Sequence, residues 1–331
     1  MKINLLRLIS FYLVFLFLAG CGHNSGGSTT SGNSYTTSTY NVEATGIAID
    51  SHGNIWLTNK INDTVIELSS NGITIGTYNV GINPSGIAID NLGNIWVANF
   101  SSNNVTKLNS NGFVIGTYEV GTGPNGIAID SSGNIWVTNR GSNNVTELNS
   151  SGITIGTYDV GLNPWGISID SFGNVWVTNS NSNNITELNS NGITIGTYNV
   201  GAYPYGIAVD SSQNIWVAVG GSTAVTKLNS RGITIARYNV GPGPEGIAID
   251  SVGNVWVTNY GYNTVTELDS NGTIIGKYSV GFGPFGIAID ASGNVWVTDP
   301  YSDLLFEFVG RAKGPQYWPY TGPQFPGGGN F

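Results

Sequence analysis

A unit of about 40 residues is repeated seven times along this chain of 331 residues, with little drift between copies. Each copy contains the run Gly-Ile-(Ala/Ser)-(Ile/Val)-Asp, followed by Asn-(Ile/Val)-Trp-(Val/Leu). A repeat of this length with four short strand patterns is typical of a propeller blade. The sequence therefore predicts an all-β, seven-bladed propeller. The copies begin at Gly46, Gly86, Gly126, Gly166, Gly206, Gly246 and Gly286.

The two ends of the repeat array complement each other. The seventh copy has strand patterns at 286–290, 294–299 and 304–309, but no fourth one. The run Thr39-Tyr40-Asn41-Val42 precedes the first copy and matches the end of a fourth strand. We expect this N-terminal strand to complete the seventh blade, because ring closure leaves no long unpaired edge.

The segment before the repeats predicts export and a lipid anchor. A positively charged start and an apolar run up to Gly20 are typical of a secretory signal peptide at residues 1–20. Leu18-Ala19-Gly20-Cys21 resembles a bacterial lipobox, which implies cleavage before Cys21 and acylation of this cysteine, the only one in the chain. The alternative is an incidental cysteine in an ordinary signal peptide. Gly22 implies sorting to the outer membrane or cell surface, so the expected location is the bacterial cell envelope.

The remaining parts of the chain differ in composition. Residues 21–36 are small and polar and predict a flexible tether, and the propeller is expected over 37–309. Residues 310–331 combine prolines with five aromatic residues, so we expect a pad packed on the propeller, a disordered extension and a docking segment being the alternatives. The net charge is −9 and no basic stripe is present, which argues against nucleic acid as a partner.

Three residue sets repeat too faithfully to indicate a ligand site. The seven tryptophans from Trp56 to Trp296 predict packing between blades. The aspartates from Asp50 to Asp290 predict turn caps. The charged residues of the third strands alternate with apolar neighbours, which predicts a solvated strand face. These charged residues are Glu67, Lys107, Glu147, Glu187, Lys227, Glu267 and Glu307.

Variation between copies gathers in the loop that enters the first strand and in the loop between the second and third strands. Both loops lie on one face of a propeller, so this face is expected to bind a glycan, a peptide or a protein. An inner ring of asparagines is expected to add hydrogen bonds; neutral drift of the loops is the alternative. The binding candidates are Phe100, Arg140, Trp165, Tyr205, Glu245, Tyr260 and Phe285. No cofactor is required, although Glu245 and Asp299 are weak candidates for binding Ca²⁺ or Mg²⁺.

The pattern Pro-x-Gly-Ile, Gly-Asn-(Ile/Val)-Trp and Asn-x-(Val/Ile)-Thr-x-Leu, over about residues 39–309, resembles the blades of NHL-repeat proteins and of the streptogramin B lyase family. The resemblance to the lyases implies a catalytic histidine in the Pro-x-Gly slot, a glutamate at the end of a second strand, and Mg²⁺. The slot residues include no histidine: Thr45, Ser85, Asn125, Trp165, Tyr205, Glu245 and Phe285. The second strands end without glutamate, at Asn59, Asn99, Asn139, Asn179, Val219, Asn259 and Asp299.

These departures favour a non-enzymatic binding scaffold over a metal-dependent enzyme of the lyase or lactonase type. The chain's other histidine outside the tether, His52, falls in a turn on the opposite face. General acid–base chemistry of the lyase kind therefore has no obvious carrier.

Overall fold

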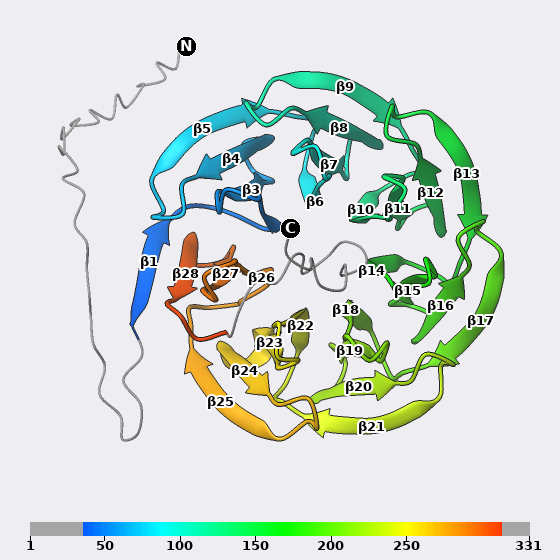
Figure 1. Ribbon diagram of the computed structural model, residues 1–331, viewed down its shortest axis with the longest axis vertical. Coiled ribbons are helices and arrows are strands. Elements are labelled where there is room, and N and C mark those ends of the chain that lie inside the picture. The colour runs from blue at the N-terminus through cyan, green and yellow to red at the C-terminus, as the bar shows by residue number, and fades with distance from the viewer. Residues whose placement is uncertain (1–35, 313–331) are drawn as a thin grey trace, which may run out of the picture.

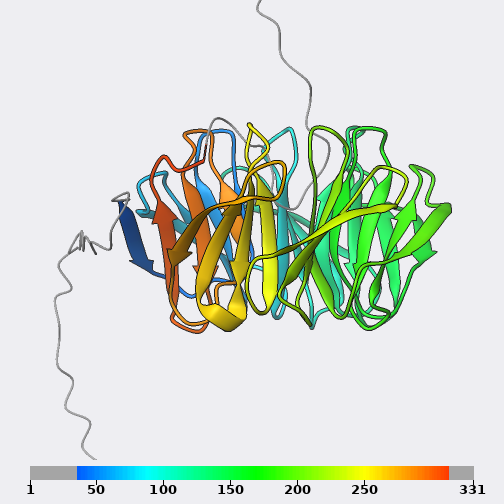
Figure 2. The same ribbon diagram turned by 90° about the horizontal axis from the view of Figure 1, so that it is seen from below.

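Each repeat folds into four antiparallel strands because short apolar runs alternate with turns rich in Asp, Asn and Gly. The computed structural model describes residues 36–312, which form seven four-stranded sheets arranged as a ring (Figure 1). Seen from the side, the loops gather on two opposite faces of the ring (Figure 2). The predicted seven-bladed propeller is confirmed. The signal peptide, Cys21, most of the tether, and residues 313–331 of the tail lie outside the described residues.

Within each blade, the four strands are ordered from the axis of the ring to its rim (Figure 1). The first strands are β2 (Ile47–Ile49), β6 (Pro84–Ile89), β10 (Pro124–Ile129), β14 (Pro164–Ile169), β18 (Pro204–Val209), β22 (Pro244–Ile249) and β26 (Ile287–Ile289). The second strands are β3 (Ile55–Asn59), β7 (Ile95–Asn99), β11 (Ile135–Asn139), β15 (Val175–Asn179), β19 (Ile215–Val219), β23 (Val255–Asn259) and β27 (Val295–Asp299).

The third and fourth strands complete the blades. The third strands are β4 (Thr64–Leu68), β8 (Asn104–Leu108), β12 (Asn144–Leu148), β16 (Asn184–Leu188), β20 (Ala224–Leu228), β24 (Thr264–Leu268) and β28 (Leu304–Phe308). The fourth strands are β1 (Thr37–Asn41), β5 (Thr74–Asn79), β9 (Val114–Glu119), β13 (Thr154–Asp159), β17 (Thr194–Asn199), β21 (Thr234–Asn239) and β25 (Ile274–Ser279). A short 3-10 helix, η1 (Tyr260–Tyr262), lies between β23 and β24.

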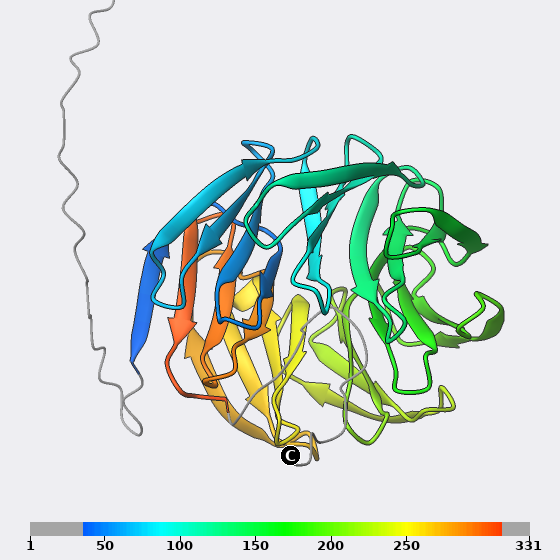
Figure 3. The ribbon, with the colours of Figure 1, turned by 45° about the horizontal axis from the view of Figure 1, so that its top comes forward.

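The first strand of the chain closes the ring. β1 pairs antiparallel with β28, from Thr37 opposite Phe308 to Asn41 opposite Leu304. Figure 3 shows blue β1 beside the orange strands from the other end of the chain. The Tyr40 ring stacks on Trp296 at 5.7 Å, as its counterparts do in other blades. The predicted closure of the seventh blade by the N-terminal strand is therefore confirmed.

The repeated tryptophans lie at the junctions between blades. All seven have 0% exposure. Trp56 of the first blade belongs to a buried cluster with Ile87, Ile95 and Val97 of the second. The prediction of packing between blades is thus confirmed, and burial of a side chain as large as tryptophan stabilises each junction.

The repeated aspartates connect the turns to these tryptophans. Asp170 accepts hydrogen bonds from the backbone nitrogens of Phe172 and Asn174 at 2.9 and 2.8 Å, which caps the turn. Its other carboxylate oxygen accepts from the indole nitrogen of Trp176 at 3.1 Å. The predicted turn-capping role is confirmed, and the carboxylate also satisfies a buried indole donor.

The prediction of a solvated row of charges in the third strands is wrong. Glu147 and Glu187 have exposures of 2% and 3%, and Lys107 only 8%. Alternation along a strand separates two faces, but in a propeller the neighbouring blades cover both. The buried charges therefore have internal partners, as buried charges require.

The partner of each buried glutamate is a tyrosine hydroxyl from the fourth strand of the same blade. Tyr158 donates to Glu147 at 2.8 Å and stacks on Trp136 at 5.5 Å. Burial, and then this hydrogen bond, raise the pKa of Tyr158 to about 12, so the hydroxyl stays protonated as a donor. The same ring fills the space beside Gly192 in the next blade, where a Cβ atom would collide with it and where φ is +74°.

Two blades replace this glutamate by lysine. Lys107 donates to the Ser150 carbonyl at 2.8 Å and lies 4.6 Å from the Trp96 ring centroid. Lys227 does the same with Ser270 and Trp216, at 3.0 and 4.4 Å. Both charge types therefore occupy one structural position, because each finds a partner within the ring.

We predict that Tyr158→Phe lowers the free energy of unfolding by about 1–3 kcal/mol, since Glu147 loses a hydrogen-bond donor while remaining buried. The matched control is Tyr118→Phe in the second blade, where Lys107 stands at the glutamate position; its expected cost is under about 0.5 kcal/mol. Denaturant unfolding of both variants measures the difference. Equal losses would show that the Tyr–Glu hydrogen bond contributes nothing specific.

Candidate functional site

Five of the seven slot residues occupy β-bulges at the start of the first strands, whereas Thr45 and Phe285 precede β2 and β26. In β10, Pro124 pairs with Asn139 and Ile127 with Val137, so Asn125 and Gly126 together stand opposite a single residue of β11. A bulge of this kind redirects a side chain out of the regular alternation. Similar register shifts occur at the starts of β6, β14, β18 and β22.

A threonine of the second strand fixes the bulge to the next blade. The Thr138 hydroxyl accepts a hydrogen bond from the Gly126 nitrogen at 2.8 Å and donates to the Trp165 carbonyl at 2.9 Å. The Gly126 Cα also approaches this carbonyl so closely that a Cβ would collide with it. The main chain of the slot ring is therefore fixed by residues that repeat, while the slot side chains remain free to differ.

Large slot side chains meet at the axis. The Trp165 and Tyr205 ring centroids are 4.8 Å apart, and Trp165 and Phe285 are 6.4 Å apart. Trp165 and Phe285 come from the fourth and seventh blades, so their contact crosses the mouth of the ring. We call Arg140, Trp165, Tyr205, Glu245 and Phe285 the axial cluster.

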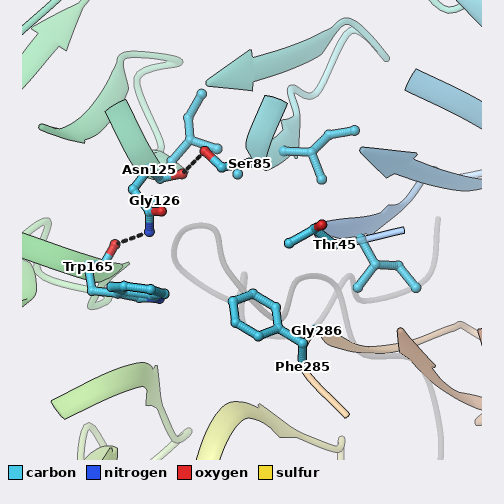
Figure 4. Close-up of a pocket in the computed structure, with 12 residues that line it drawn as sticks. Thr45, Ser85, Asn125, Gly126, Trp165, Phe285 and Gly286 are labelled. Atoms are coloured by element: carbon cyan, nitrogen blue, oxygen red, sulfur yellow. Dashed lines mark hydrogen bonds between the residues drawn. The ribbon is translucent and has the colours of Figure 1, made fainter. Parts of the chain in front are cut away.

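The contact between Trp165 and Phe285 borders a small hollow that opens to solvent. Figure 4 shows these two rings along one side of the hollow and Ser85 opposite them. The hollow is lined by residues of blades one, two, three, four and seven, including Thr45 and Asn125, whereas Arg140, Tyr205 and Glu245 do not line it. The mouth thus combines an aromatic wall with a wall of small polar side chains.

Arg140, from the loop between β11 and β12, lies flat on the aromatic wall. Its guanidinium carbon is 3.9 Å from the Trp165 ring centroid and 5.4 Å from that of Phe100, within the range of cation–π attraction. Its Nε donates to the Asn163 side-chain oxygen at 2.8 Å. Burial lowers the pKa of the guanidinium, but arginine remains charged at neutral pH.

Glu245 is the acidic member of the axial cluster. The residue is half-buried, but burial of its carboxyl raises the pKa to about 8, with Arg140 acting in the opposite direction. A large fraction of Glu245 is therefore protonated at neutral pH. Burial and the negative charge of Glu245 also raise the pKa of Tyr205.

The structure brings together most of the predicted binding residues. Phe100 contacts the axial cluster through Arg140. Tyr260 is 41% exposed and packs edge-on against Tyr301 at 5.6 Å, so it lies beside the cluster and interacts with it electrostatically, through Glu245. Whether any of these residues binds a ligand remains a prediction.

The prediction that an inner ring of asparagines offers hydrogen bonds to a ligand is wrong. Asn99, Asn139, Asn179 and Asn259 have 0% exposure. The Asn139 amide donates to Asn144 and Thr146 of β12, each at 2.9 Å, so it joins two strands of its own blade. These side chains are fully buried, and their Oδ1 atoms have no hydrogen-bond partner within the described residues.

The weak metal candidates do not fit a divalent cation. The Asp299 carboxylate is buried and accepts from the Tyr301 and Ser302 nitrogens at 3.2 and 3.1 Å and from the Ser302 hydroxyl at 3.2 Å. Glu245 is largely protonated. Within residues 36–312, no three His, Cys, Asp or Glu side chains cluster as a metal site would require. The donor set therefore does not match the Mg²⁺ that the family resemblance implies.

Sequence comparison between blades missed two residues of this region. Asn163 holds Arg140 and itself has a positive φ of 54°. Tyr301 partners Tyr260. Asn163 lies two positions before the variable slot residue of its blade, and Tyr301 one position after the variable site of the second loop, so a comparison of whole loops could have found them.

We predict that the wild-type protein loses stability relative to Glu245→Gln as pH rises from about 4.5 towards 8. The folded state binds the Glu245 proton more tightly than the unfolded state, because its pKa of about 8 exceeds the ordinary value of 4.5. The stabilisation from this proton is complete below the pKa of Glu245 in the unfolded state. It is lost as the pH rises through the pKa of Glu245 in the folded state. Denaturant unfolding of both proteins at several pH values measures the difference; a constant difference would contradict the assignment.

Solved structures with this fold include virginiamycin B lyase from Staphylococcus aureus, with a TM-score of 0.76 and 18% identity, covering 83% of this chain and 99% of that chain. A streptogramin B lyase structure has a TM-score of 0.75 and 21% identity, and the match covers 82% of this chain and 96% of that chain. Kuenenia stuttgartiensis hydrazine synthase has a TM-score of 0.76 and 16% identity, and the match covers 82% of this chain and 96% of that chain. At these identities the likeness concerns the fold alone.

No curated protein matches the sequence. The profile of the virginiamycin B lyase family matches residues 21–218, which is more than half of the chain. The repeats, the closed seven-bladed ring and this match lead to one conclusion: the chain belongs to the virginiamycin B lyase family.

Proposed function

We propose that this chain is a non-enzymatic binding propeller that recognises a glycan, peptide or protein ligand at the axial mouth. The observation that carries the proposal is the contact of Arg140, Trp165, Tyr205 and Phe285 beside an open hollow. Aromatic faces next to a few polar groups are the usual composition of a ligand site. The repeating residues already account for the stability of the ring, so these variable side chains are available for recognition.

The chemistry of the slots supports binding over turnover. The slots contain no histidine, the amide nitrogens of the buried asparagines donate to side chains of their own blades, and Asp299 accepts internal hydrogen bonds. A general base of the lyase kind is therefore missing from the positions where the family resemblance implies it.

The proposal includes attachment to a lipid bilayer through acylated Cys21, at the outer membrane or surface of a bacterial cell. The lipobox-like run and Gly22 support it. Stable anchoring by acyl chains needs two or more of them, as on a lipoprotein cysteine. No helix within residues 36–312 has the length and apolarity needed to span a membrane.

One observation favours a second candidate, an enzyme of the lyase or lactonase type. Glu245 lies in the mouth with a pKa of about 8, a value suited to accepting or donating a proton near neutral pH. This candidate requires that turnover depend on Glu245, whereas a binding scaffold retains ligand affinity in Glu245→Gln.

The predicted test is a thermal-shift survey of the purified protein with cell-wall glycan fragments, simple sugars, peptides, Ca²⁺ and Mg²⁺. We expect one ligand class to raise the unfolding midpoint, and the triple variant Trp165→Ala, Tyr205→Ala, Phe285→Ala to lose this shift, because bound ligand stabilises only the folded state. The control is Ile82→Ala, Leu162→Ala, Phe282→Ala, which removes exposed apolar side chains from entering loops outside the cluster; it should keep the shift.

A shift that survives in the axial triple variant would place recognition elsewhere. Ester or lactone turnover that disappears in Glu245→Gln would replace the binding proposal by the enzyme candidate.

A further inference from the structure

We propose that the ligand of the axial mouth carries an anionic group, most simply a carboxylate, on a flat apolar or aromatic skeleton. The inference rests on the proposed binding function and specifies the chemical class of its ligand. It depends on how Arg140 is held, on the charge balance around it and on the shape of the adjoining hollow.

Arg140 is held with most of its donors unused. The guanidinium carbon lies over the Trp165 ring, 3.9 Å from its centroid, and the Nε donates to Asn163, so two contacts restrict the movement of this group. A guanidinium has five N–H donors, and only this one has an acceptor among residues 36–312. Two terminal nitrogens therefore remain to bind a ligand. Their planar fork matches the two oxygens of a carboxylate.

Asn163 is itself immobilised, so the orientation of Arg140 is built into the fold. Its backbone nitrogen donates to Asn143 at 2.8 Å, and its side-chain nitrogen donates to the buried Ser180 at 2.7 Å. Its carbonyl accepts from the Ser180 hydroxyl at 3.0 Å. A guanidinium pre-oriented in this way loses little freedom when it binds an anion.

The charge of Arg140 has no counter-ion within the described residues. No carboxylate there forms an ion pair with it, and the acidic group that faces it, Glu245, is largely protonated at neutral pH. Desolvated charges without a partner are costly, so an anionic ligand gains from neutralising this cation. A positive mouth also stands out on a protein with a net charge of −9.

The hollow determines the rest of the ligand. Trp165 and Phe285 give it flat apolar walls, and Ser85 and Asn125 line the other side. Asn125 donates to the Trp165 carbonyl at 3.3 Å, which directs its side chain towards the same wall. Arg140 does not line the hollow itself but lies over Trp165, which does, so a flat ring against the aromatic wall reaches Arg140 with a carboxylate that extends past the Trp165 ring. A neutral glycan would fill the hollow but leave the cation unpaired.

The test compares benzoate, benzamide and benzamidinium, which share one ring and carry a negative, zero and positive charge. Ligand-observed NMR titrations with the purified protein at pH 7 and low salt give the three dissociation constants. We expect benzoate to bind at least about tenfold more tightly than benzamide, and benzamidinium more weakly than either. Arg140→Gln should reduce benzoate affinity to that of benzamide, and leave benzamide unchanged.

The control is Arg237→Gln, which makes the same charge change at an exposed arginine of the outer strand β21. It should leave all three dissociation constants unchanged. The inference is overturned if benzamide binds as tightly as benzoate, if benzamidinium binds best, if no probe binds, or if Arg237→Gln matches Arg140→Gln. None of these results decides the proposed binding function, which is judged by the loss of a ligand shift in the axial triple variant.

Discussion

The burial of one tryptophan at each junction between blades is the interaction on which this ring depends. The indole fills the gap to the next blade, a turn aspartate accepts its N–H in six of the seven blades, and a fourth-strand tyrosine typically stacks on it. In five blades the same tyrosine donates its hydroxyl to a buried glutamate, and in six its ring packs against a glycine of the following blade. Side chains from two neighbouring blades are thus joined in one unit, which repeats around the ring.

This unit explains why the loop sequences hardly vary between blades on one face of the ring and vary widely on the other. In six blades the turn aspartate accepts the indole N–H, so its replacement there would leave a buried donor unsatisfied. On the opposite face, the slot glycine and a second-strand threonine hold the main chain of the slot in five of the seven blades, for example Gly126 and Thr138. The slot side chain itself varies, from Ser85, whose hydroxyl donates to the carbonyls of Ala98 and Pro124, to Trp165 two blades on. The axial cluster is the result.

Much of the architecture follows from the sequence because it is periodic. The blade count, the turn caps, the tryptophan junctions and the completion of the last blade by Thr39 to Val42 all depend on residue type and spacing alone. The placement of the variable loops on one face follows from strand direction. These features are local or repeat with a fixed period, so inspection of one chain suffices.

Features that depend on radial distance could not be predicted in this way. Alternation in the third strands separates two faces but does not show that neighbouring blades cover both, so the burial of Glu147 was missed. The buried asparagines were misplaced because the end of a strand does not determine the depth of its side chain. The sequence also shows to which blade each slot residue belongs, but not how far its side chain extends towards the axis. The contact of Trp165 with Phe285, from blades that are not neighbours, depends on the width of the ring at the axis.

The central claim is that repeating residues build the ring while slot residues are free to serve recognition. The most direct measurement is the unfolding midpoint of a chain whose large slot residues are exchanged for those of other blades: Trp165→Asn, Tyr205→Ser and Phe285→Thr. The account predicts a shift below about 5 °C, since a protein of this size moves roughly 2–4 °C per kcal/mol. A fall of about 10 °C or more would contradict it, because the axial side chains would then be part of the structure that holds the blades together.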